Sequence, residues 1–337
     1  MSPAGPAGPL GGEASRTSPA DGERSYRRIL VTGAHGFLGR HIVPRLRAAF
    51  EAEWILPSRR DYDLLEPGVP ERLLRDTRPE AVIHLAAKSG GILDNRLRPA
   101  DYFYENLMMN TAVFHAAFRA GARAFLTLMG GCSYPADASS PISEDQMWNG
   151  YPQPESAAYA LAKRMLLVQS RAYREQHGFR SVVLIPGNVY GEGDNFNLQQ
   201  AHVIPAMIRK FAEAVEERRE EVLLLGSGRP TRDFVYAGDV AALIPWFLRH
   251  YDSSEPVNIS TGRAVSIRRL AGLIARFSGY GGSIRWDSAQ PDGQRTKIFD
   301  PRRLHALGLA CPTPLEEGLR RTIAWFREAR PRGEIRL

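Results

Sequence analysis

Short apolar runs alternate along the chain with longer segments in which apolar residues recur at helical spacing. The apolar runs include 29–31, 79–91, 123–131 and 181–191, and the helical patterns include 103–120 and 156–175. Strands that alternate with helices in this way predict an α/β fold built on a doubly wound parallel sheet. Ligands of such sheets bind at the carboxyl ends of the strands, so we expect the functional residues there.

A glycine-rich turn separates the first apolar run from a helix. Gly33, Gly36 and Gly39 have the spacing GxxGxxG. In a Rossmann-type fold the first glycine permits a tight turn, the second lets a pyrophosphate approach the backbone, and the third lets helix and strand pack closely. The helix N-terminus then offers free N–H groups to the phosphates. The pattern predicts a dinucleotide site, with Phe37 and Leu38 among its residues.

The end of the second predicted strand bears on the choice of cofactor. Residues 57–60 there read Pro-Ser-Arg-Arg. A hydroxyl and guanidinium groups favour the 2′-phosphate of NADP, so Ser58 and Arg59 are assigned to it. Asp61 and Asp63 follow closely, and an acid near this strand end is typical of sites for NAD. NADP(H) is therefore the prediction, and NAD is the alternative.

Two further segments are expected to contact the cofactor. In the run at 79–91 these residues are Ala86, Ala87 and Lys88, where small side chains let the backbone lie against the cofactor. In the run at 181–191 they are Pro186, Asn188 and Val189. Both segments end predicted strands, which is where a doubly wound sheet binds its ligands.

Tyr159 and Lys163 form a YxxxK pair on the helical pattern at 156–175. A spacing of four residues places both side chains on one face of a helix. An ammonium group beside a phenol favours the phenolate and lowers the phenol pKa. Tyr159 is therefore a candidate acid or base, and Lys163 a candidate ligand for the nicotinamide ribose. An ordinary amphipathic helix is the alternative interpretation.

Longer strings extend these motifs. They include AAKSGGI, PADYFYEN, CSYP, YALAK, NVYGEGDNF, HVIPAMIRKF, GSGRPTRDFVYAGDVA and PDGQRTKIFD. On these strings the chain resembles the extended short-chain dehydrogenase/reductase family over residues 27–327, and more narrowly its GDP-L-fucose synthase group. The resemblance implies epimerisation of a GDP-linked 4-keto-6-deoxyhexose at C3 and C5 and reduction at C4 with NADPH. By analogy it also implies a homodimer formed through the helices at 103–120 and 156–175.

The resemblance assigns roles to single residues. Cys132 and His202 match the base and the acid that act on the carbons beside the ketone. Inversion needs one group on each face of the sugar ring, and a lysine near Cys132 would help to hold the thiolate. Asn106 resembles a buried polar residue that organises the active-site helix. The residues expected at the substrate are Asn188, Arg209, Arg232 and Lys297.

The string LMGGCSYP departs from the family pattern. Gly130 stands where serine or threonine usually binds the substrate carbonyl, and Gly131 stands where serine is common. Thr127, Ser133 or a water molecule could supply the missing hydrogen bond. Loss of one such donor costs on the order of a hundredfold in rate. We therefore expect a slower or rearranged hydride transfer, or a substrate that needs the space.

Three functions are open at this point. The first is an NADP-dependent epimerase/reductase that acts on a nucleotide-linked 4-keto sugar. The second is an epimerase that retains its cofactor and inverts C5, or C3 and C5, without net reduction. The third is an impaired relative that only binds a nucleotide sugar. Net consumption of NADPH separates the first two, and the intact Tyr159, Lys163, Cys132 and His202 argue against the third.

Composition narrows the setting. Residues 1–25 predict a disordered tail, 26–190 a cofactor-binding domain that regains part of 230–262, and 191–330 a substrate lobe. The net charge of +7 is scattered, which does not favour a nucleic-acid partner. Two distant cysteines predict neither a disulfide framework nor a metal site and are typical of a cytoplasmic protein. No apolar run approaches the length that spans a membrane.

Overall fold

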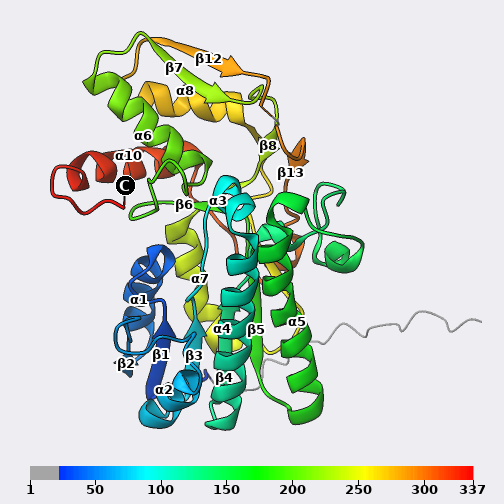
Figure 1. The fold of residues 1–337 in the computed structure, drawn as a ribbon. Helices are drawn as coiled ribbons and strands as arrows, with labels where there is room; N and C mark the ends of the chain where they lie inside the picture. Colours follow the sequence, from blue (N-terminus) through cyan, green and yellow to red (C-terminus); the bar gives the residue numbers. More distant parts are fainter. Residues whose placement is uncertain (1–22, 291, 337) are drawn as a thin grey trace, which may run out of the picture.

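A six-stranded sheet forms the centre of the larger of two lobes in the computed structural model, which describes residues 23–290 and 292–336 (Figure 1). All neighbouring strands are parallel, in the order β10-β5-β4-β3-β1-β2. The strand order reverses between β1 and β3, so the carboxyl ends of these two strands mark the expected ligand-binding crevice. The strands are β1 (Arg28–Thr32), β2 (Glu53–Ile55), β3 (Ala81–His84), β4 (Ala124–Leu128), β5 (Ser181–Pro186) and β10 (Val257–Ile259).

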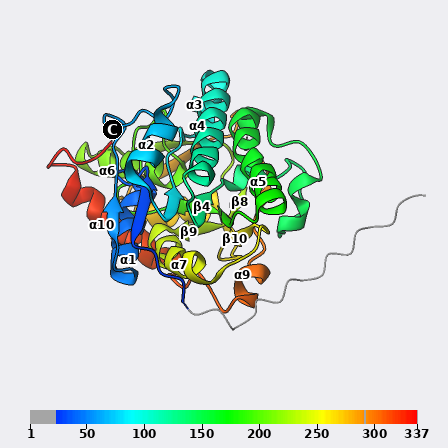
Figure 2. The same cartoon turned by 90° about the horizontal axis from the view of Figure 1, so that it is seen from below.

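Helices cover both faces of this sheet (Figures 1 and 2). Ile29 and Val31 of β1 pack in one apolar cluster with residues of α1 (Phe37–Ala49) and α7 (Ala237–His250). Leu30, which points the other way, packs in a second cluster with residues of two helices on the opposite face. Those helices are α2 (Val69–Thr77) and α4 (Pro99–Arg119), and α5 (Ala157–His177) lies beside α4. The doubly wound Rossmann-type fold is confirmed.

The smaller lobe has a core of its own. Its largest buried side chains include Phe196, Phe211 and Phe326. The side chains of β7 alternate between exposed and buried, as expected of a strand with one face against a core. The lobe's elements are α6 (Val203–Glu216), β7 (Glu221–Leu225), α8 (Ile267–Phe277), β12 (Ser283–Asp287) and α10 (Leu315–Ala329).

Short elements lie between and beside the two lobes. Strand β8 pairs with both β11 and β13, while β6 pairs with β9. These strands are β6 (Asn188–Tyr190), β8 (Thr231–Arg232), β9 (Phe234–Tyr236), β11 (Val265–Ser266) and β13 (Thr296–Lys297). The short helices are α3 (Ile92–Leu97), α9 (Arg302–Ala306) and the 3-10 turns η1 (Gly131–Ser133), η2 (Glu144–Trp148) and η3 (Pro154–Ser156).

Two local predictions are wrong. The run at 181–191 is not one strand, because it divides at Gly187 into β5 of the large sheet and β6 of a separate pair. Gly187 N completes the pairing with β10 at Ile259 O, and the next residue, Asn188, donates its N–H to Asp233 O, where the pairing with β9 begins. Asp239, an acid before an apolar helical pattern, predicts the start of a helix at that residue. Helix α7 instead begins at Ala237, and the Asp239 carboxylate accepts hydrogen bonds from the hydroxyl and the amide of Thr313.

Other local predictions meet different outcomes. Ser266 precedes an amphipathic pattern and therefore predicts an N-cap. This prediction is confirmed, because Ser266 accepts a hydrogen bond from Arg269 N at the start of α8. The predicted tail falls mostly on residues 1–22, which lie outside the described part of the chain. The described chain begins three residues before the expected domain boundary, and Arg24 forms an ion pair with Asp252. Within the described residues, no helix combines the length and apolar character needed to cross a membrane.

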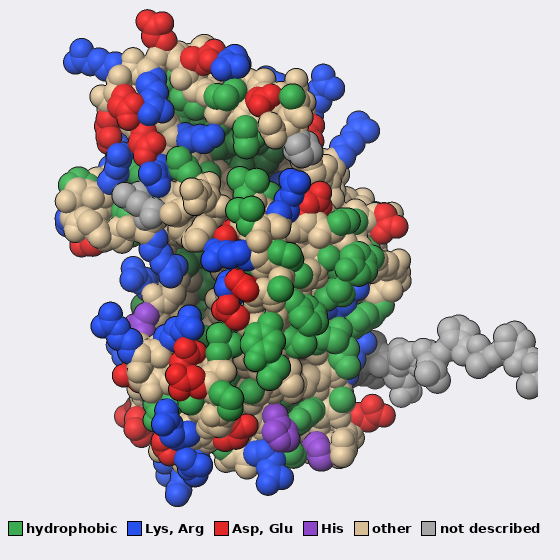
Figure 3. All heavy atoms as spheres, viewed as in Figure 1, with side chains coloured by type: hydrophobic (Ala, Val, Ile, Leu, Met, Phe, Trp, Pro, Cys, Tyr) green, Lys and Arg blue, Asp and Glu red, His purple; other side chains and the backbone are tan. Residues whose placement is uncertain are grey.

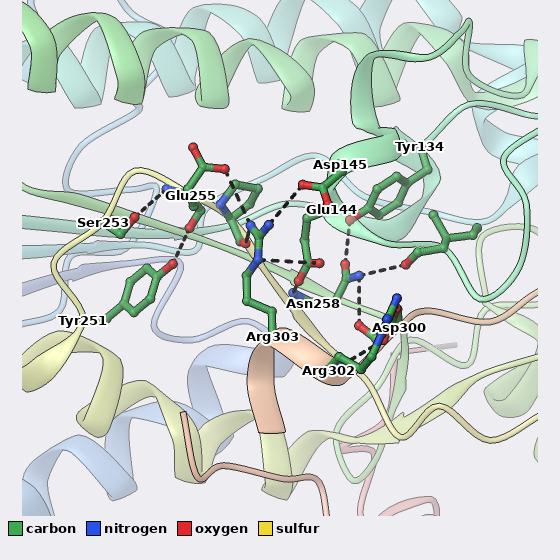
Figure 4. Close-up of polar contacts among 12 residues, drawn as sticks. Tyr134, Glu144, Asp145, Tyr251, Ser253, Glu255, Asn258, Asp300, Arg302 and Arg303 are labelled. Atoms are coloured by element: carbon green, nitrogen blue, oxygen red, sulfur yellow. Dashed lines mark hydrogen bonds and ion pairs between the residues drawn. The ribbon is translucent and has the colours of Figure 1, made fainter. Parts of the chain in front are cut away.

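A buried polar network joins β10 to the segments around it (Figure 4). The side-chain amide of Asn258 donates to Ile142 O at 3.0 Å and to Asp300 O at 3.3 Å. Its oxygen accepts a hydrogen bond of 2.7 Å from the Tyr134 hydroxyl. Tyr134 directly follows η1, so this network holds the end of the turn that contains Cys132.

Candidate active site

The glycine-rich turn has the geometry of a dinucleotide site. Gly33 has a φ of +69°, and a Cβ atom there would lie 2.6 Å from Ala86 N, so the turns after β1 and β3 touch at this point. A Cβ atom at Gly39 would lie 2.4 Å from the oxygens of Gly33 and Ala34. Only glycine permits these two approaches.

The second glycine begins the helix. Gly36 is the N-cap residue of α1, no side chain caps this end, and the first turn contains no acid. Free N–H groups at a helix N-terminus favour a phosphate group. Phe37 and Leu38 follow in the first turn of the helix, both half-buried. The turn therefore fits the pyrophosphate of a dinucleotide.

The residues assigned to the 2′-phosphate are engaged with neighbouring acids. The Ser58 hydroxyl donates to Asp61 at 2.7 Å, and Arg59 pairs with Asp63 at 3.0 Å. Arg59 and Arg60 are both exposed. The surface at this strand end therefore contains charges of both signs.

The segment after β3 lies between that strand and α4. Ala86 is half-buried and Ala87 is exposed. Asn106, which is fully buried, accepts a hydrogen bond from Lys88 N and donates to Lys88 O, so it fixes the backbone of this segment. The Lys88 ammonium group pairs with Glu105. Lys88 can therefore contact a cofactor through its backbone while its charge is compensated by α4.

Tyr159 and Lys163 lie on α5, and Lys163 contacts the carboxyl end of β4. Lys163 is buried, and its ammonium group lies 3.4 Å from Leu128 O, at the end of β4. Burial lowers the pKa of Lys163 to about 8. Burial also raises the pKa of Tyr159, and the nearby Cys132 and Tyr102 act in the same direction. The predicted lowering of the phenol pKa is therefore wrong for the protein without its cofactor, because desolvation dominates, and the phenol is protonated.

Cys132 and Tyr159 meet beside Gly130. A Cβ atom at Gly130 would lie 3.1 Å from the Cys132 Sγ, 3.4 Å from the Tyr159 Cε1 and 3.7 Å from the Tyr159 hydroxyl oxygen. The thiol and the phenol therefore border the same small space, which is where the family's serine or threonine would stand. This is the central geometric observation of the site.

The charge state of Cys132 reflects two opposed effects. Burial raises the pKa of the thiol, while Lys297 and, less strongly, Lys163 lower it. The net pKa is raised, so the expected stabilisation of a thiolate is incomplete in the protein without ligands. Lys297 is itself buried, and its pKa is lowered to about 8 by that burial.

The two hydroxyl groups considered as replacements for serine are directed elsewhere. Thr127 donates to His84 O at 2.9 Å, and Ser133 donates to Ala160 O at 3.2 Å. The glycine at position 131 has a different explanation from the one at 130. A Cβ atom at Gly131 would lie 2.3 Å from the ring of Phe299. Phe299 occupies the space that a side chain at position 131 would need.

His202 lies at the start of the smaller lobe. It is the N-cap residue of α6, but its side chain does not cap the helix, so the imidazole is not committed to a backbone role. The residue as a whole is exposed. The protein packed around the imidazole desolvates it, which lowers its pKa. Gly91 N, at the start of α3, binds Gln200 O and so fixes the segment before His202. Helix α6, which His202 begins, belongs to the smaller lobe, whereas Cys132 lies in η1, which follows β4 of the large sheet.

The residues expected at the substrate fall into two groups. Arg232 and Lys297 pair directly in the β8–β13 register, and burial lowers the pKa of both. Arg209 instead pairs with Glu213 and binds Phe196 O. The structure thus brings Cys132, Tyr159, Lys163, Lys297 and Arg232 into one region, with Arg209 held separately on α6.

The segment after β5 is held by the backbone of Asp233, a buried residue. Asn188 donates its side-chain amide to Asp233 O at 2.9 Å. The Asp233 side chain accepts hydrogen bonds from Ser260 and Thr261. Pro186 is the last residue of β5, and Val189 packs against the core of the large lobe.

Three residues near the reacting groups escaped sequence reasoning. Tyr102 lies edge-on to Tyr159, with ring centroids 6.1 Å apart. Phe299 closes the space beside Gly131, and Arg164 binds the backbone of η1. Aromatic and arginine side chains such as these are common in any helix or strand, so their local sequence contains no signal of this placement.

Comparison with known proteins identifies the family. Residues 29–260 match the NAD dependent epimerase/dehydratase family. The chain belongs to this family. The GDP-L-fucose synthase of Sinorhizobium fredii is 38% identical over 300 residues, which cover 89% of this chain and 95% of that relative. The GDP-L-fucose synthase of Escherichia coli is 35% identical over 319 residues, or 91% of this chain and 99% of the relative.

A solved structure shows the same fold. The GDP-L-fucose synthetase of Naegleria fowleri, bound to NADP, has a TM-score of 0.86 and 27% sequence identity, and the match covers 94% of this chain and 99% of that one. The likeness extends over both lobes, so this member of the epimerase/dehydratase family has the complete two-lobed architecture. A nicotinamide cofactor is characteristic of the family, and the glycine-rich turn fits it.

Proposed function

We propose that the protein is a GDP-sugar epimerase/reductase that inverts C3 and C5 of a GDP-linked 4-keto-6-deoxyhexose and then reduces C4 with NADPH. The observation that carries this proposal is the shared space beside Gly130, which both the Cys132 thiol and the Tyr159 hydroxyl border. A group that moves a proton on carbon and a group that protonates the neighbouring oxygen must lie this close together. The GDP-L-fucose synthases among its relatives support the choice of substrate.

The residues divide the work between two kinds of proton transfer. A carbon beside a ketone loses its proton to a positioned base, and a donor on the other ring face returns one. We assign Cys132 and His202 to these steps, one from each lobe. Tyr159, whose pKa is raised by burial, is protonated and donates its proton to O4 during reduction. When bound, the nicotinamide supplies the hydride that C4 receives.

We assign the cofactor as NADP(H). The hydroxyl of Ser58 and the guanidinium of Arg59 lie at the end of β2, where the 2′-phosphate is bound in this fold. The solved relative from Naegleria fowleri, which is bound to NADP, supports this assignment. Arg232, Lys297 and Asn188 are assigned to the nucleotide sugar, because two adjacent cationic groups suit a diphosphate.

We also propose that the protein is a homodimer. Figure 3 shows hydrophobic side chains gathered on the face formed by α4 and α5. Large exposed patches of this kind mark interaction sites. The exposed apolar residues on this face, which we call the α4–α5 patch, are Phe103, Tyr104, Met108 and Val168, with Ile92, Leu93 and Leu97 of α3 beside them.

The proposed function is tested with GDP-4-keto-6-deoxymannose in deuterated water. We expect one NADPH oxidised per product, with deuterium at C3 and C5, and exchange without reduction when NADPH is omitted. Tyr159→Phe should lose reduction by about 10²–10⁴-fold and retain exchange. Cys132→Ser should lose exchange. Exchange that survives unchanged in Cys132→Ser, or epimerisation without net NADPH oxidation, would overturn the proposal.

A further inference from the structure

The turn that contains Cys132 has little internal support. Within η1, Ser133 N binds Gly130 O at 2.9 Å, and Tyr134 N reaches Gly131 O at 3.4 Å. Two consecutive glycines precede the cysteine, and glycine has the greatest backbone freedom of any residue. The position of the thiol therefore depends on contacts from outside the turn.

Contacts that hold the turn come from three parts of the chain. The ring of Phe299 packs against Gly131, and the Tyr134 hydroxyl binds Asn258 on β10 (Figure 4). The third contact comes from α5, where Arg164 follows Lys163 directly. Arg164 and the bond from the Ser133 hydroxyl to Ala160 O both link the turn to the helix that contains Tyr159.

Arg164 is buried, with 5% of its surface exposed, and its hydrogen-bond partners are backbone carbonyls. Its Nε donates to Ser133 O at 3.0 Å, and one of its terminal nitrogens donates to the same oxygen. The other terminal nitrogen donates to Gly150 O at 3.1 Å. The guanidinium also lies 5.4 Å from the centre of the Trp148 ring. The planar group therefore holds the residue after Cys132 with two bonds, which a lysine could not reproduce.

We propose that Arg164 is a positioning residue that fixes the Cys132 thiol relative to the Tyr159 phenol. Together with the bond from Ser133 to Ala160 O, it makes η1 and α5 one rigid unit. The spacing between the carbon-directed thiol and the oxygen-directed phenol is then set by one helix. The catalytic consequence of this role rests on the proposed function. The placement of the thiol itself can be measured without substrate.

The first test measures thiol reactivity. Alkylation of Cys132 by iodoacetamide is followed by mass spectrometry in the wild type, Arg164→Met and Arg164→Lys, with Cys311 as the internal reference. A released glycine turn exposes the thiol, so we expect the rate ratio of Cys132 to Cys311 to rise at least about threefold in Arg164→Met. Arg164→Lys retains the charge and one hydrogen bond and should lie between the two. An unchanged ratio in both variants would overturn the proposal.

The second test separates positioning from general stability. Deuterium exchange at C3 and C5 should fall at least about tenfold in Arg164→Met, with KM changed less than about threefold, because misplacement of a reacting group lowers the rate more than binding. Reduction of the already epimerised ketone should change much less. A parallel loss of exchange and reduction would indicate a general structural role and contradict the proposal.

Arg180→Met is the matched control. Arg180 is also a buried arginine, and its hydrogen bonds include carbonyls of Phe247, Leu248 and Tyr251, far from η1 in the sequence. This variant should lose stability without a change in the alkylation ratio or in the balance between exchange and reduction. If it reproduces the Arg164→Met pattern, the inference is wrong. If the wild type neither exchanges nor reduces the substrate, the proposed function fails, while the alkylation test still decides the role of Arg164.

Discussion

Gly130 leaves the reacting space beside Cys132 and Tyr159 open, and Gly130→Ser should fill it with a hydroxyl group. The new Cβ atom would lie 3.4 Å from the Tyr159 Cε1, so its oxygen can reach a carbonyl bound beside the phenol. We expect the reduction rate to rise up to about tenfold, since one such donor is worth 10²–10³ elsewhere. Steady-state oxidation of NADPH measures this change. A collapse of turnover would show that the glycine makes room for the substrate.

Gly131→Ser is the control for that substitution. The neighbouring glycine faces the ring of Phe299, where a Cβ atom would lie 2.3–3.1 Å from ring atoms. Overpacking of this kind costs about 1–3 kcal/mol of unfolding free energy. Gly131→Ser should therefore lower the melting temperature, whereas Gly130→Ser should change it little, because only the Cys132 Sγ must shift.

The raised pKa of Cys132 leads to a pH prediction. Burial holds the thiol protonated near neutral pH, and proton removal from the sugar requires the thiolate. Deuterium exchange without NADPH should therefore accelerate from pH 7 toward about 9, where an ordinary thiol ionises. Exchange that slows over this range would contradict Cys132 as the base and point to another acceptor. Cys132→Ser provides the baseline.

Lys297 leads to a prediction about stability. Its pKa falls from 10.5 to about 8 on folding, so between these values the unfolded chain binds the extra proton, and the stability of the native protein rises with pH. Below pH 8 the buried ammonium group costs stability. Lys297→Met should therefore raise the unfolding free energy at pH 7 by about 1–3 kcal/mol.

Urea unfolding at pH 7 and 9.5 checks this sign. The advantage of Lys297→Met should shrink at the higher pH, because the wild-type amine is then largely neutral. A variant that is less stable than the wild type at pH 7 would show that the ammonium group is satisfied in the fold. Loss of turnover in the same variant is expected, since Lys297 is assigned to the diphosphate.

Single residues show where sequence reasoning reaches its limit. The YxxxK spacing placed Tyr159 and Lys163 on one face of a helix, but it could not show that burial would raise the pKa of the phenol. The departure at Gly131 was visible in the sequence, whereas its partner Phe299 is 168 positions away, in the string PDGQRTKIFD, where it was given no role. Desolvation and long-range packing depend on the assembled fold, so no local pattern contains them.

At the scale of elements, the parallel strands could be predicted because both faces of the sheet are buried, whereas their order in the sheet was not predicted. Buried parallel strands appear as continuous apolar runs such as 124–128, with glycines or polar residues at their carboxyl ends. The division of 181–191 was missed for the same reason, since β5 and β6 are both mainly apolar and only the pairing partner distinguishes them. Hydrophobic periodicity shows that a strand exists and does not show which sheet contains it.

The segment after β2 supports a prediction on cofactor choice. Arg59 is exposed and forms an ion pair with Asp63, which a 2′-phosphate can replace. Arg59→Ala should raise KM for NADPH about tenfold with kcat little changed, because the contact binds ground and transition states equally. KM for NADH should stay constant. Equal changes for both cofactors would place Arg59 outside the 2′-phosphate site.

At the scale of the molecule, the two lobes divide the proposed chemistry. The large lobe supplies Cys132, Tyr159 and Lys163 at the carboxyl edge of its sheet, while His202 begins the first helix of the small lobe. Groups that must act on opposite faces of one sugar ring can then come from opposite sides of one site. Such an arrangement depends on how the lobes are placed, so α3, which lies between them at the upper end of α4, has a structural part in it (Figure 1).

The α4–α5 patch provides the test of assembly. Tyr104 is 59% exposed on α4, and burying it against a second copy would remove apolar surface from water. Light scattering of the wild type should give twice the 37.5 kDa mass of the chain. Tyr104→Glu and Met108→Glu should shift the mass toward one chain, because an interface with a buried unpaired charge is strongly disfavoured.

Leu225→Glu, at a similarly exposed position on β7 of the other lobe, should remain dimeric. A monomeric wild type, or dimers that persist in both patch variants, would remove the patch as the interface, and retained activity in a monomeric variant would show that each active site is complete within one chain.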